Sequence, residues 1–173
     1  MAGIGLAEHH ALGPDLPSHE AKFAKAGFKP WWTQAEATAA GGSTGGTAVA
    51  LSRSWSGARL DLVACDAKTG LPFKPDHWTA VTVRGADFRF IWVSLYLVAG
   101  QPLGSGVNFL RLQGLATWLR LVKVPWIITA DWNHPPDELR ASLWPDLLGA
   151  CVVPPEHCEL TCTTGGGACS TTA

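Results

Sequence analysis

The chain has 173 residues, of which 47% are hydrophobic and 16% are charged, and its formal net charge is −1. A chain of this length can bury one core, and its near-neutral charge excludes a protein that holds nucleic acid mainly through a basic surface. No apolar run approaches the roughly 18 residues of a membrane span, and we expect no signal peptide because the N-terminus lacks a basic region followed by an apolar one.

Helical and extended patterns follow one another along the chain without an internal repeat. In chain order they are a strand at 3–7 that ends at Glu8, a helix at 18–28 with Ser18 as its N-cap and Gly27 as its stop, a flexible loop at 38–46, strands at 46–52 and 59–64, a hairpin with arms at 77–84 and 87–97, a helix of about 16 residues that opens at 104–106, a strand that ends at Asp131, and a short helix at 136–143.

This order mixes hairpins with helices and has no strict β-α-β alternation. It predicts an α/β protein whose sheets are mostly antiparallel or mixed, with helices packed outside them. We expect a single domain over 1–160. The tail at 161–173 is rich in Thr and Gly and cannot build a core, so we expect it to be unstructured and truncated.

The most informative segment is the apolar run at 124–130, which leads directly into Asp131 and Asn133. Side chains alternate faces along a strand, so we expect these two residues to project to the same side. A carboxylate beside an amide can activate a water molecule and hold an oxyanion. Pro135 and Pro136 prevent the strand from continuing. The alternative is a simple turn, in which Asx side chains bond the local backbone.

Polar residues end or interrupt apolar strands at three places: Glu8, Tyr96, and the pair Asp131 and Asn133. If these strands are adjacent, all of these groups reach one edge. In their order and local sequence they resemble the endonuclease/exonuclease/phosphatase family of metal-dependent phosphoesterases. Four segments carry the resemblance: 4–8 with its closing glutamate, 45–50 with its Gly-Gly start, 93–96 with its closing tyrosine, and 129–135, which is similar to the family's Gly-Asp-x-Asn signature but has Ala130 in place of the glycine.

The resemblance covers residues 3–165 and implies a partial two-sheet β-sandwich with flanking helices, of the four-layer α/β/β/α type. Within the family, the chain most resembles the endonuclease branch carried by retroelement-type polyproteins. The family also has a strand with an asparagine before its glutamate strand, and a final Asp-His pair. This chain contains neither, so the resemblance implies a fragment that lacks the N-terminal and C-terminal strands.

The resemblance implies a role for each polar strand end. Glu8 would bind Mg²⁺ or Mn²⁺, which prefer oxygen ligands. Asp131 would orient or deprotonate the attacking water, Asn133 would hydrogen-bond that water or a phosphate oxygen, and Tyr96 would stabilise the developing charge as a phenol or phenolate. Loss of one such electrostatic group commonly costs about a hundred- to a thousandfold in rate. We therefore expect the chain without the family's histidine to be inactive or nearly so.

The implied function is metal-dependent hydrolysis of phosphodiesters by an endonuclease, with nucleic acid, and DNA in particular, as the substrate. Two alternatives remain open. One is a phosphatase or phosphodiesterase that acts on a lipid or another small phosphoester. The other is a non-catalytic interaction domain whose site has decayed.

The histidines and cysteines of the chain indicate less about its function. His9 and His10 are expected to be a solvated loop pair, and neither they nor His134 occupy the family's histidine position. Trp132 and His134 could line a substrate groove, although Trp132 could equally belong to the core. The residues that could suggest zinc fit no closed motif; they are Cys151, His157, Cys158, Cys162 and Cys169. Five cysteines, an odd number, do not suggest a disulfide framework, so we expect an intracellular protein of the cytoplasm or nucleus.

Overall fold

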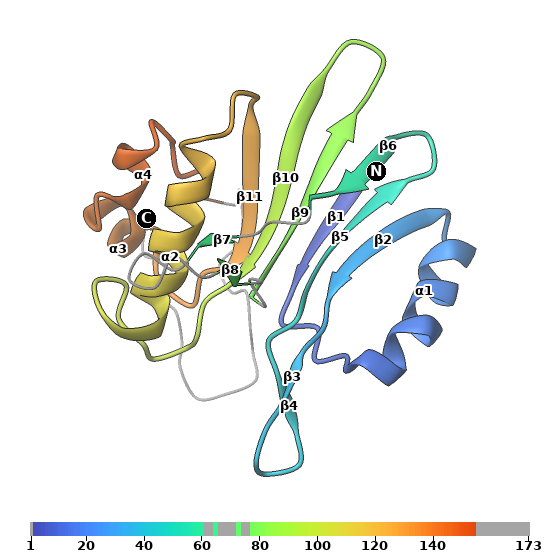
Figure 1. The fold of residues 1–173 in the computed structure, drawn as a ribbon, viewed down its shortest axis with the longest axis horizontal. Helices are drawn as coiled ribbons and strands as arrows, with labels where there is room; N and C mark the ends of the chain where they lie inside the picture. Colours follow the sequence, from blue (N-terminus) through green and yellow to red (C-terminus); the bar gives the residue numbers. More distant parts are fainter. Residues whose placement is uncertain (1, 61–63, 66–71, 74–76, 155–173) are drawn as a thin grey trace. The chain divides into compact units, whose positions relative to one another are not determined.

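The computed structural model describes residues 2–60, 64–65, 72–73 and 77–154 (Figure 1). Its contacts divide the chain into two compact units, Met1–Asn133 and His134–Ala173, and each is described by itself. The elements of the first unit are β1 (Gly3–Ala7), the 3-10 turn η1 (Gly13–Asp15), α1 (Leu16–Lys25), β2 (Phe28–Thr33), β3 (Glu36–Ala37), β4 (Ser43–Thr44), β5 (Thr47–Ser52), β6 (Ser56–Arg59), β7 (Ala64–Cys65), β8 (Pro72–Phe73), β9 (Trp78–Arg84), β10 (Arg89–Tyr96), α2 (Gly106–Leu119) and β11 (Trp126–Asp131).

The described part of the second unit, up to residue 154, contains two short helices, α3 (Pro136–Ala141) and α4 (Trp144–Leu147). An ion pair within it joins Arg140 to Asp137 across 2.7 Å. The predicted unstructured tail at 161–173 lies outside the described residues. None of the described helices has the length and apolar character needed to cross a membrane.

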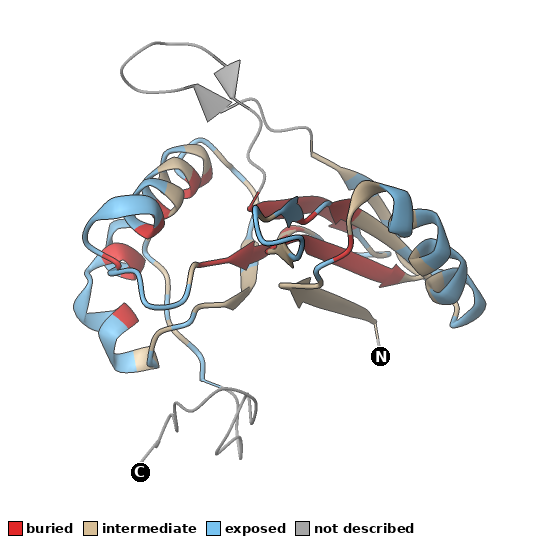
Figure 2. Cartoon of the chain, turned by 90° about the horizontal axis from the view of Figure 1, so that it is seen from below, coloured by how far each residue is buried: buried red, intermediate tan, exposed pale blue. Residues whose placement is uncertain are grey.

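Two sheets form the centre of the first unit. The first has the strand order β1-β5-β2 and is antiparallel throughout, whereas the second has the order β11-β10-β9-β6 and joins β10 to β11 in parallel. Helix α1 packs on β2. Helices α1 and α2 lie on opposite sides of the pair of sheets (Figures 1 and 2). The predicted α/β class with antiparallel and mixed sheets, arranged as a two-sheet sandwich with flanking helices, is confirmed.

The core lies between the two sheets, where Figure 2 shows the buried segments of the strands. Val49 and Leu51 of β5 pack against Val81 and Val83 of β9, and all four side chains are fully buried. Every residue of β5 from Thr47 to Leu51 is buried. A strand covered on both faces is expected to be a continuous apolar run, as Ala48-Val49-Ala50-Leu51 is, and not an alternating one.

Glycines in β1 let the first sheet approach the second closely. A Cβ atom added to Gly5 would lie 2.0 Å from Thr129 Oγ1, and one added to Gly3 would lie 2.5 Å from the Trp92 ring. The Ser94 hydroxyl donates a hydrogen bond across the gap to the Leu6 carbonyl oxygen. The small residues of this segment are therefore required by the distance between the sheets, which fixes β1 over β10 and β11.

Three threonine hydroxyls form a buried polar cluster between the sheets. Thr79 Oγ1 lies 2.9 Å from both Thr47 Oγ1 and Thr33 Oγ1. Thr33 donates in turn to the carbonyl oxygen of Trp78, 3.0 Å away. Buried hydroxyls that are fully hydrogen-bonded contribute to stability, while one that loses its partner costs the desolvation of the group.

We expect Thr79→Val to lower the free energy of unfolding by about 1–3 kcal/mol, because the isosteric side chain leaves the hydroxyls of Thr33 and Thr47 without their shared partner. Urea unfolding measures the change. The matched control is Thr117→Val, which removes an exposed hydroxyl that bonds to Gln113 O within its own helix, and should change stability by less than about 0.5 kcal/mol. Equal losses in both variants would contradict the contribution of the cluster.

Several predicted boundaries were wrong. Ser18 is not an N-cap, because η1 runs directly into α1, which begins at Leu16 with a proline in its first turn. Gly27 does end the helix, with φ of +85°. Strand β2 was not predicted. The loop expected at 38–46 contains β4, which pairs with β3. The strand expected at 59–64 is replaced by β6, which begins at Ser56, and residues 61–63 lie outside the described residues.

Candidate active site

Three strands end at the same edge of the two sheets. Strands β10 and β11 run in parallel, with Tyr96 aligned with Asp131 as the final pair. Strand β1 packs on both of them, and Glu8 follows its last residue. The structure therefore brings the predicted Glu8, Tyr96 and Asp131 together, although their strands belong to two different sheets.

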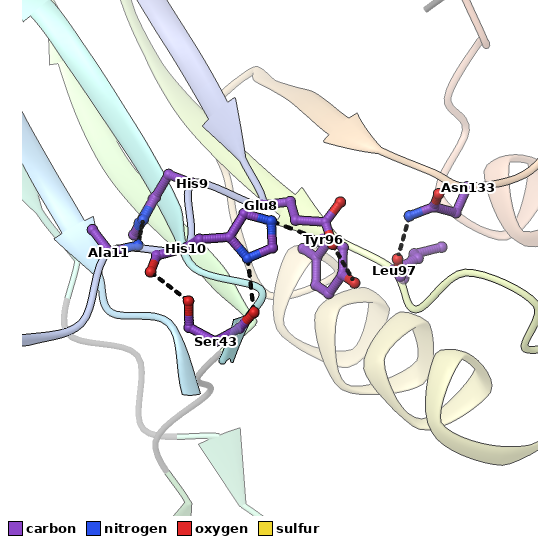
Figure 3. A network of polar contacts seen from close by, with 8 residues as sticks. All are labelled: Glu8, His9, His10, Ala11, Ser43, Tyr96, Leu97 and Asn133. Atoms are coloured by element: carbon purple, nitrogen blue, oxygen red, sulfur yellow. Dashed lines mark hydrogen bonds and ion pairs between the residues drawn. The ribbon is translucent and has the colours of Figure 1, made fainter. Parts of the chain in front are cut away.

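A hydrogen bond joins Glu8 and Tyr96 directly. The Tyr96 hydroxyl donates to Glu8 Oε1 across 3.0 Å (Figure 3). Tyr96 is 5% exposed, whereas the Glu8 side chain is 34% exposed. The backbone of Glu8 has φ of +56°, a left-handed conformation that costs free energy for a non-glycine residue. The carboxylate is thus held in place on the buried side by a phenol and remains open to solvent on the other.

The Asp131 carboxyl has an environment that disfavours its charge. Burial raises the pKa of Asp131, and the nearby Glu8 carboxylate raises it further by repulsion and by a hydrogen bond, while hydrogen bonds from Asn133 act in the opposite direction. Two carboxyl groups this close favour the uptake of a proton or of a cation between them. A carboxylate with a raised pKa is also a better base than an ordinary aspartate.

Tyr96 is held as a neutral phenol. Burial raises the pKa of Tyr96, the hydrogen bond to Glu8 and the negative charges of Glu8 and Asp131 raise it further, and a hydrogen bond with Thr44 lowers it. The Arg111 guanidinium lies 5.6 Å from the centre of the Tyr96 ring and donates to the Tyr96 carbonyl oxygen. Burial and the two carboxylates thus favour a hydrogen-bond donor over a phenolate at this position.

Asn133 is positioned differently from the sequence prediction. Strand β11 ends at Asp131, and Asn133 has φ of +51°, so strand alternation does not determine its direction. Its backbone N–H donates to Asp131 Oδ1 at 3.2 Å, which is the turn considered as the alternative. Its side-chain amide donates to the Leu97 carbonyl oxygen at 2.8 Å (Figure 3). Asn133 thus ties the loop after β11 to the end of β10.

Two consecutive glycines lie against residues of the site. Gly45 and Gly46 both have positive φ, +71° and +82°. A Cβ atom on Gly45 would lie 3.3 Å from the Tyr96 ring, and one on Gly46 would lie 2.5 Å from the His9 ring. The predicted Gly-Gly segment therefore leaves room for the tyrosine of the site and for the histidine that follows Glu8.

His9 is a structural residue, and the prediction that it is solvated was wrong. Its Nε2 lies 3.1 Å from the Thr33 carbonyl oxygen, and its Nδ1 accepts the N–H of Ala11 at 3.0 Å. Because a carbonyl can only accept and a backbone N–H can only donate, the ring is the neutral Nε2–H tautomer. The ring packs edge-on against Trp32 at 5.1 Å, and burial lowers the pKa of His9.

This arrangement predicts how stability depends on pH. Since the pKa of His9 is lowered in the folded state, the unfolded chain binds the proton first, and the stability that neutral His9 contributes is present above about pH 6.5 and is lost as the pH falls below it. We expect the free energy of unfolding in urea to fall between about pH 7.5 and about pH 5.5, and to fall less in His9→Gln. Equal pH dependence in both proteins would contradict this assignment.

His10 is a site residue that sequence reasoning missed. Its Nε2 lies 3.9 Å from Glu8 Oε1, and its Nδ1 lies 2.9 Å from the Ser43 carbonyl oxygen (Figure 3). The Ser43 hydroxyl donates back to the His10 carbonyl oxygen at 2.7 Å. The contacts with Ser43 join residues 33 positions apart, so only the tertiary structure reveals them.

The remaining predicted residues take no part in the contacts described above. His134 Nδ1 pairs with Glu138 at 3.0 Å within the second unit. Trp132 is half-buried, and Cys151 is an exposed free cysteine. His157 and Cys158 to Cys169 lie outside the described residues. Within the described ranges no three side chains of His, Cys, Asp or Glu are grouped so as to hold a metal ion.

Comparison with solved structures identifies proteins that are similar to this chain. The catalytic domain of human Nocturnin, solved with bound sulfate, is 16% identical, with a TM-score of 0.56 over 83% of this chain and 55% of that domain. The endonuclease domain of TRAS1, a telomere-specific non-LTR retrotransposon, is 15% identical (TM-score 0.46; 78% of this chain, 64% of that one). Humanized D. rerio TDP2 with 14 mutations is 14% identical, with a TM-score of 0.48 over 82% of this chain and 56% of that one.

All three proteins are members of the endonuclease/exonuclease/phosphatase superfamily. At these identities the similarity concerns the fold alone, and the chain spans about half the length of the Nocturnin domain (55%). No protein-family model and no curated protein sequence matches the chain. The similarity to the Nocturnin domain confirms the fold that the sequence resemblance implied.

Proposed function

We propose that this chain, which has the fold of the endonuclease/exonuclease/phosphatase superfamily, forms the core of a divalent-metal-dependent phosphodiesterase that cleaves nucleic acid. The observation that carries the proposal is the convergence of Glu8, Tyr96 and Asp131 from strands of two sheets. A phenol donates to the Glu8 carboxylate at 3.0 Å, and burial together with Glu8 raises the pKa of the neighbouring Asp131 carboxyl, an arrangement typical of a catalytic edge.

The side chains fit a hard divalent cation. Glu8 and Asp131 repel each other, and a cation that neutralises both would remove that repulsion. Mg²⁺ in phosphoryl-transfer sites is commonly held by one or two carboxylates, with water and substrate phosphate as the other ligands, so a cluster of three protein ligands is not required. Glu8 would hold the ion. When bound, it would neutralise the scissile phosphate and the developing charge on the leaving oxygen.

Asp131 would orient the attacking water and accept its proton, a role that its raised pKa supports. Tyr96 would act as a neutral donor: it holds the Glu8 carboxylate and stabilises negative charge on the phosphate. Asn133 donates one amide hydrogen to the Leu97 carbonyl oxygen and would hydrogen-bond the water or a phosphate oxygen through its other amide hydrogen, or the water through Oδ1. In the arrangement described here it fixes the loop that carries Asp131.

The nucleic-acid substrate and the retroelement-type branch rest on the sequence resemblance. The net charge of −1 gives no general basic surface, so phosphate contacts would be local or mediated by the metal. The expectation that the 173 residues alone have little activity also remains a prediction.

The test is nicking of supercoiled plasmid DNA in Mg²⁺ or Mn²⁺, with the protein extended at both ends by its own coding sequence because the chain spans 55% of the Nocturnin domain. We expect metal-dependent nicking that Asp131→Ala abolishes. Absence of nicking in the extended protein, or nicking that Asp131→Ala leaves unchanged, would contradict the proposal.

A further inference from the structure

His10 follows Glu8 by two residues and is held rigidly although it is exposed. Its backbone has φ of +57°, its N–H donates to the Gly45 carbonyl oxygen at 3.1 Å, and its carbonyl oxygen accepts the Ser43 hydroxyl. The side chain is 52% exposed. A solvated loop histidine needs none of these constraints, and a left-handed conformation persists in a non-glycine residue only where surrounding contacts enforce it.

The contact with Ser43 also fixes which ring nitrogen carries the hydrogen. The Ser43 carbonyl oxygen can only accept, so His10 Nδ1 is the donor at 2.9 Å. In the neutral ring Nε2 then presents its lone pair on the side of Glu8. Histidines that bind metal ions almost always donate their other ring N–H to a carbonyl or a carboxylate, which orients the ring and fixes the tautomer. His10 already has this second bond.

The separation of the two donor atoms suits one ion between them. His10 Nε2 and Glu8 Oε1 are 3.9 Å apart, which is too long for a hydrogen bond. Two metal–ligand bonds of roughly 2.0–2.2 Å each span at most about 4.4 Å. A single ion can therefore contact both atoms with little movement of either side chain. The same Glu8 oxygen accepts the Tyr96 hydroxyl, which orients the carboxylate as Ser43 orients the imidazole.

We propose that His10 joins Glu8 as a ligand of the site's metal ion, so that the site binds a first-row transition-metal dication in preference to Mg²⁺. This inference rests on the proposed function only in placing a metal ion at Glu8. An imidazole nitrogen is a softer ligand than a carboxylate oxygen, and it favours transition metals over Mg²⁺, which is held almost entirely by oxygen.

The test uses Mn²⁺ as a paramagnetic probe of the full chain. Electron spin echo envelope modulation detects a directly bound ¹⁴N nucleus, and loss of the free-ion signal in electron paramagnetic resonance gives the Kd for Mn²⁺. His10→Asn removes the imidazole but keeps a residue that tolerates positive φ. The matched control is His134→Asn. His134 also pairs with a glutamate, Glu138, but their two atoms are 3.0 Å apart, which leaves no room for an ion between them.

We expect histidine modulation in the wild type and in His134→Asn but none in His10→Asn. We also expect His10→Asn to raise the Kd for Mn²⁺ about tenfold or more and the Kd for Mg²⁺ less than about threefold. One outcome would overturn the inference and leave the proposed function standing: Glu8→Gln abolishes Mn²⁺ binding, but the wild type shows no histidine modulation and His10→Asn binds Mn²⁺ as the wild type does. Binding that Glu8→Gln does not weaken would overturn the metal site of both.

Discussion

Asp131→Asn is expected to lower metal-dependent cleavage of DNA about a thousandfold and, at the same pH, to stabilise the folded protein. The loss of activity follows from the proposed role of Asp131, because an amide cannot accept a proton from the attacking water. Asparagine has nearly the same shape and retains Oδ1, so the bond from the Asn133 N–H is preserved. The variant therefore removes the charge and leaves the turn intact.

The expected gain in stability follows from the sign of the pKa shift. The folded-state pKa of Asp131 is raised, so the fold disfavours the ionised form, and stability falls as the pH rises from the unfolded value toward the folded one. At neutral pH the ionised Asp131 repels Glu8. After allowance for screening at a half-exposed site, we expect the variant to gain about 0.5–1 kcal/mol in the free energy of unfolding.

Plasmid nicking and urea unfolding near neutral pH check the two parts separately. Asp137→Asn is the control, since it also removes one carboxylate, which is 92% exposed and paired with Arg140 in the second unit. It should change neither activity nor stability appreciably. A loss of stability in Asp131→Asn would contradict the electrostatic account, and retained activity would contradict the proposed role.

Gly46→Ala should be among the most destabilising single substitutions in the described part of the chain, at about 2–5 kcal/mol. Two effects add. At φ of +82° an alanine adopts a left-handed backbone, which costs roughly 1–2 kcal/mol. Its Cβ would lie 2.5 Å from the His9 ring, and displacing a packed ring typically costs a further 1–3 kcal/mol, by order of magnitude.

The chain offers a control that separates these effects. Gly41 has the same φ of +82°, and nothing lies within 4 Å of its added Cβ. Gly41→Ala therefore measures the backbone cost alone, and the difference between the variants in urea unfolding measures the displacement of His9. Because His9 lies between Glu8 and His10, Gly46→Ala should also weaken Mn²⁺ binding, whereas Gly41→Ala should not. Equal effects in both variants would contradict the packing of His9 against Gly46.

The sequence revealed the strand ends of the site because its residues lie within strong local patterns. Strand β10 is an apolar run that ends at Tyr96, and β11 is another that ends at Asp131. The parallel alignment of their last residues depends on tertiary pairing, which local patterns do not specify. The resemblance to a known family supplied the missing condition that these strands are adjacent.

There are physical reasons why some elements were not predicted from the sequence. Strand β2 contains Pro30, which normally argues against a strand, but β2 is an edge strand and tolerates a missing N–H. Strands β3 and β4 have two residues each, too short for any periodic pattern. His10 is two residues from Glu8 in sequence, but its constraint comes from Ser43, and no local feature indicates that contact.

The central claim is that Glu8, with Tyr96 and Asp131 beside it, holds a divalent cation at the shared edge of two sheets. An anomalous difference map from a crystal of the protein soaked in MnCl₂ tests it most directly. We expect a peak within bonding distance of the Glu8 carboxylate, next to Asp131 and within reach of His10 Nε2. A Mn²⁺ peak only at other positions, with this edge empty at a saturating concentration of the ion, would contradict it.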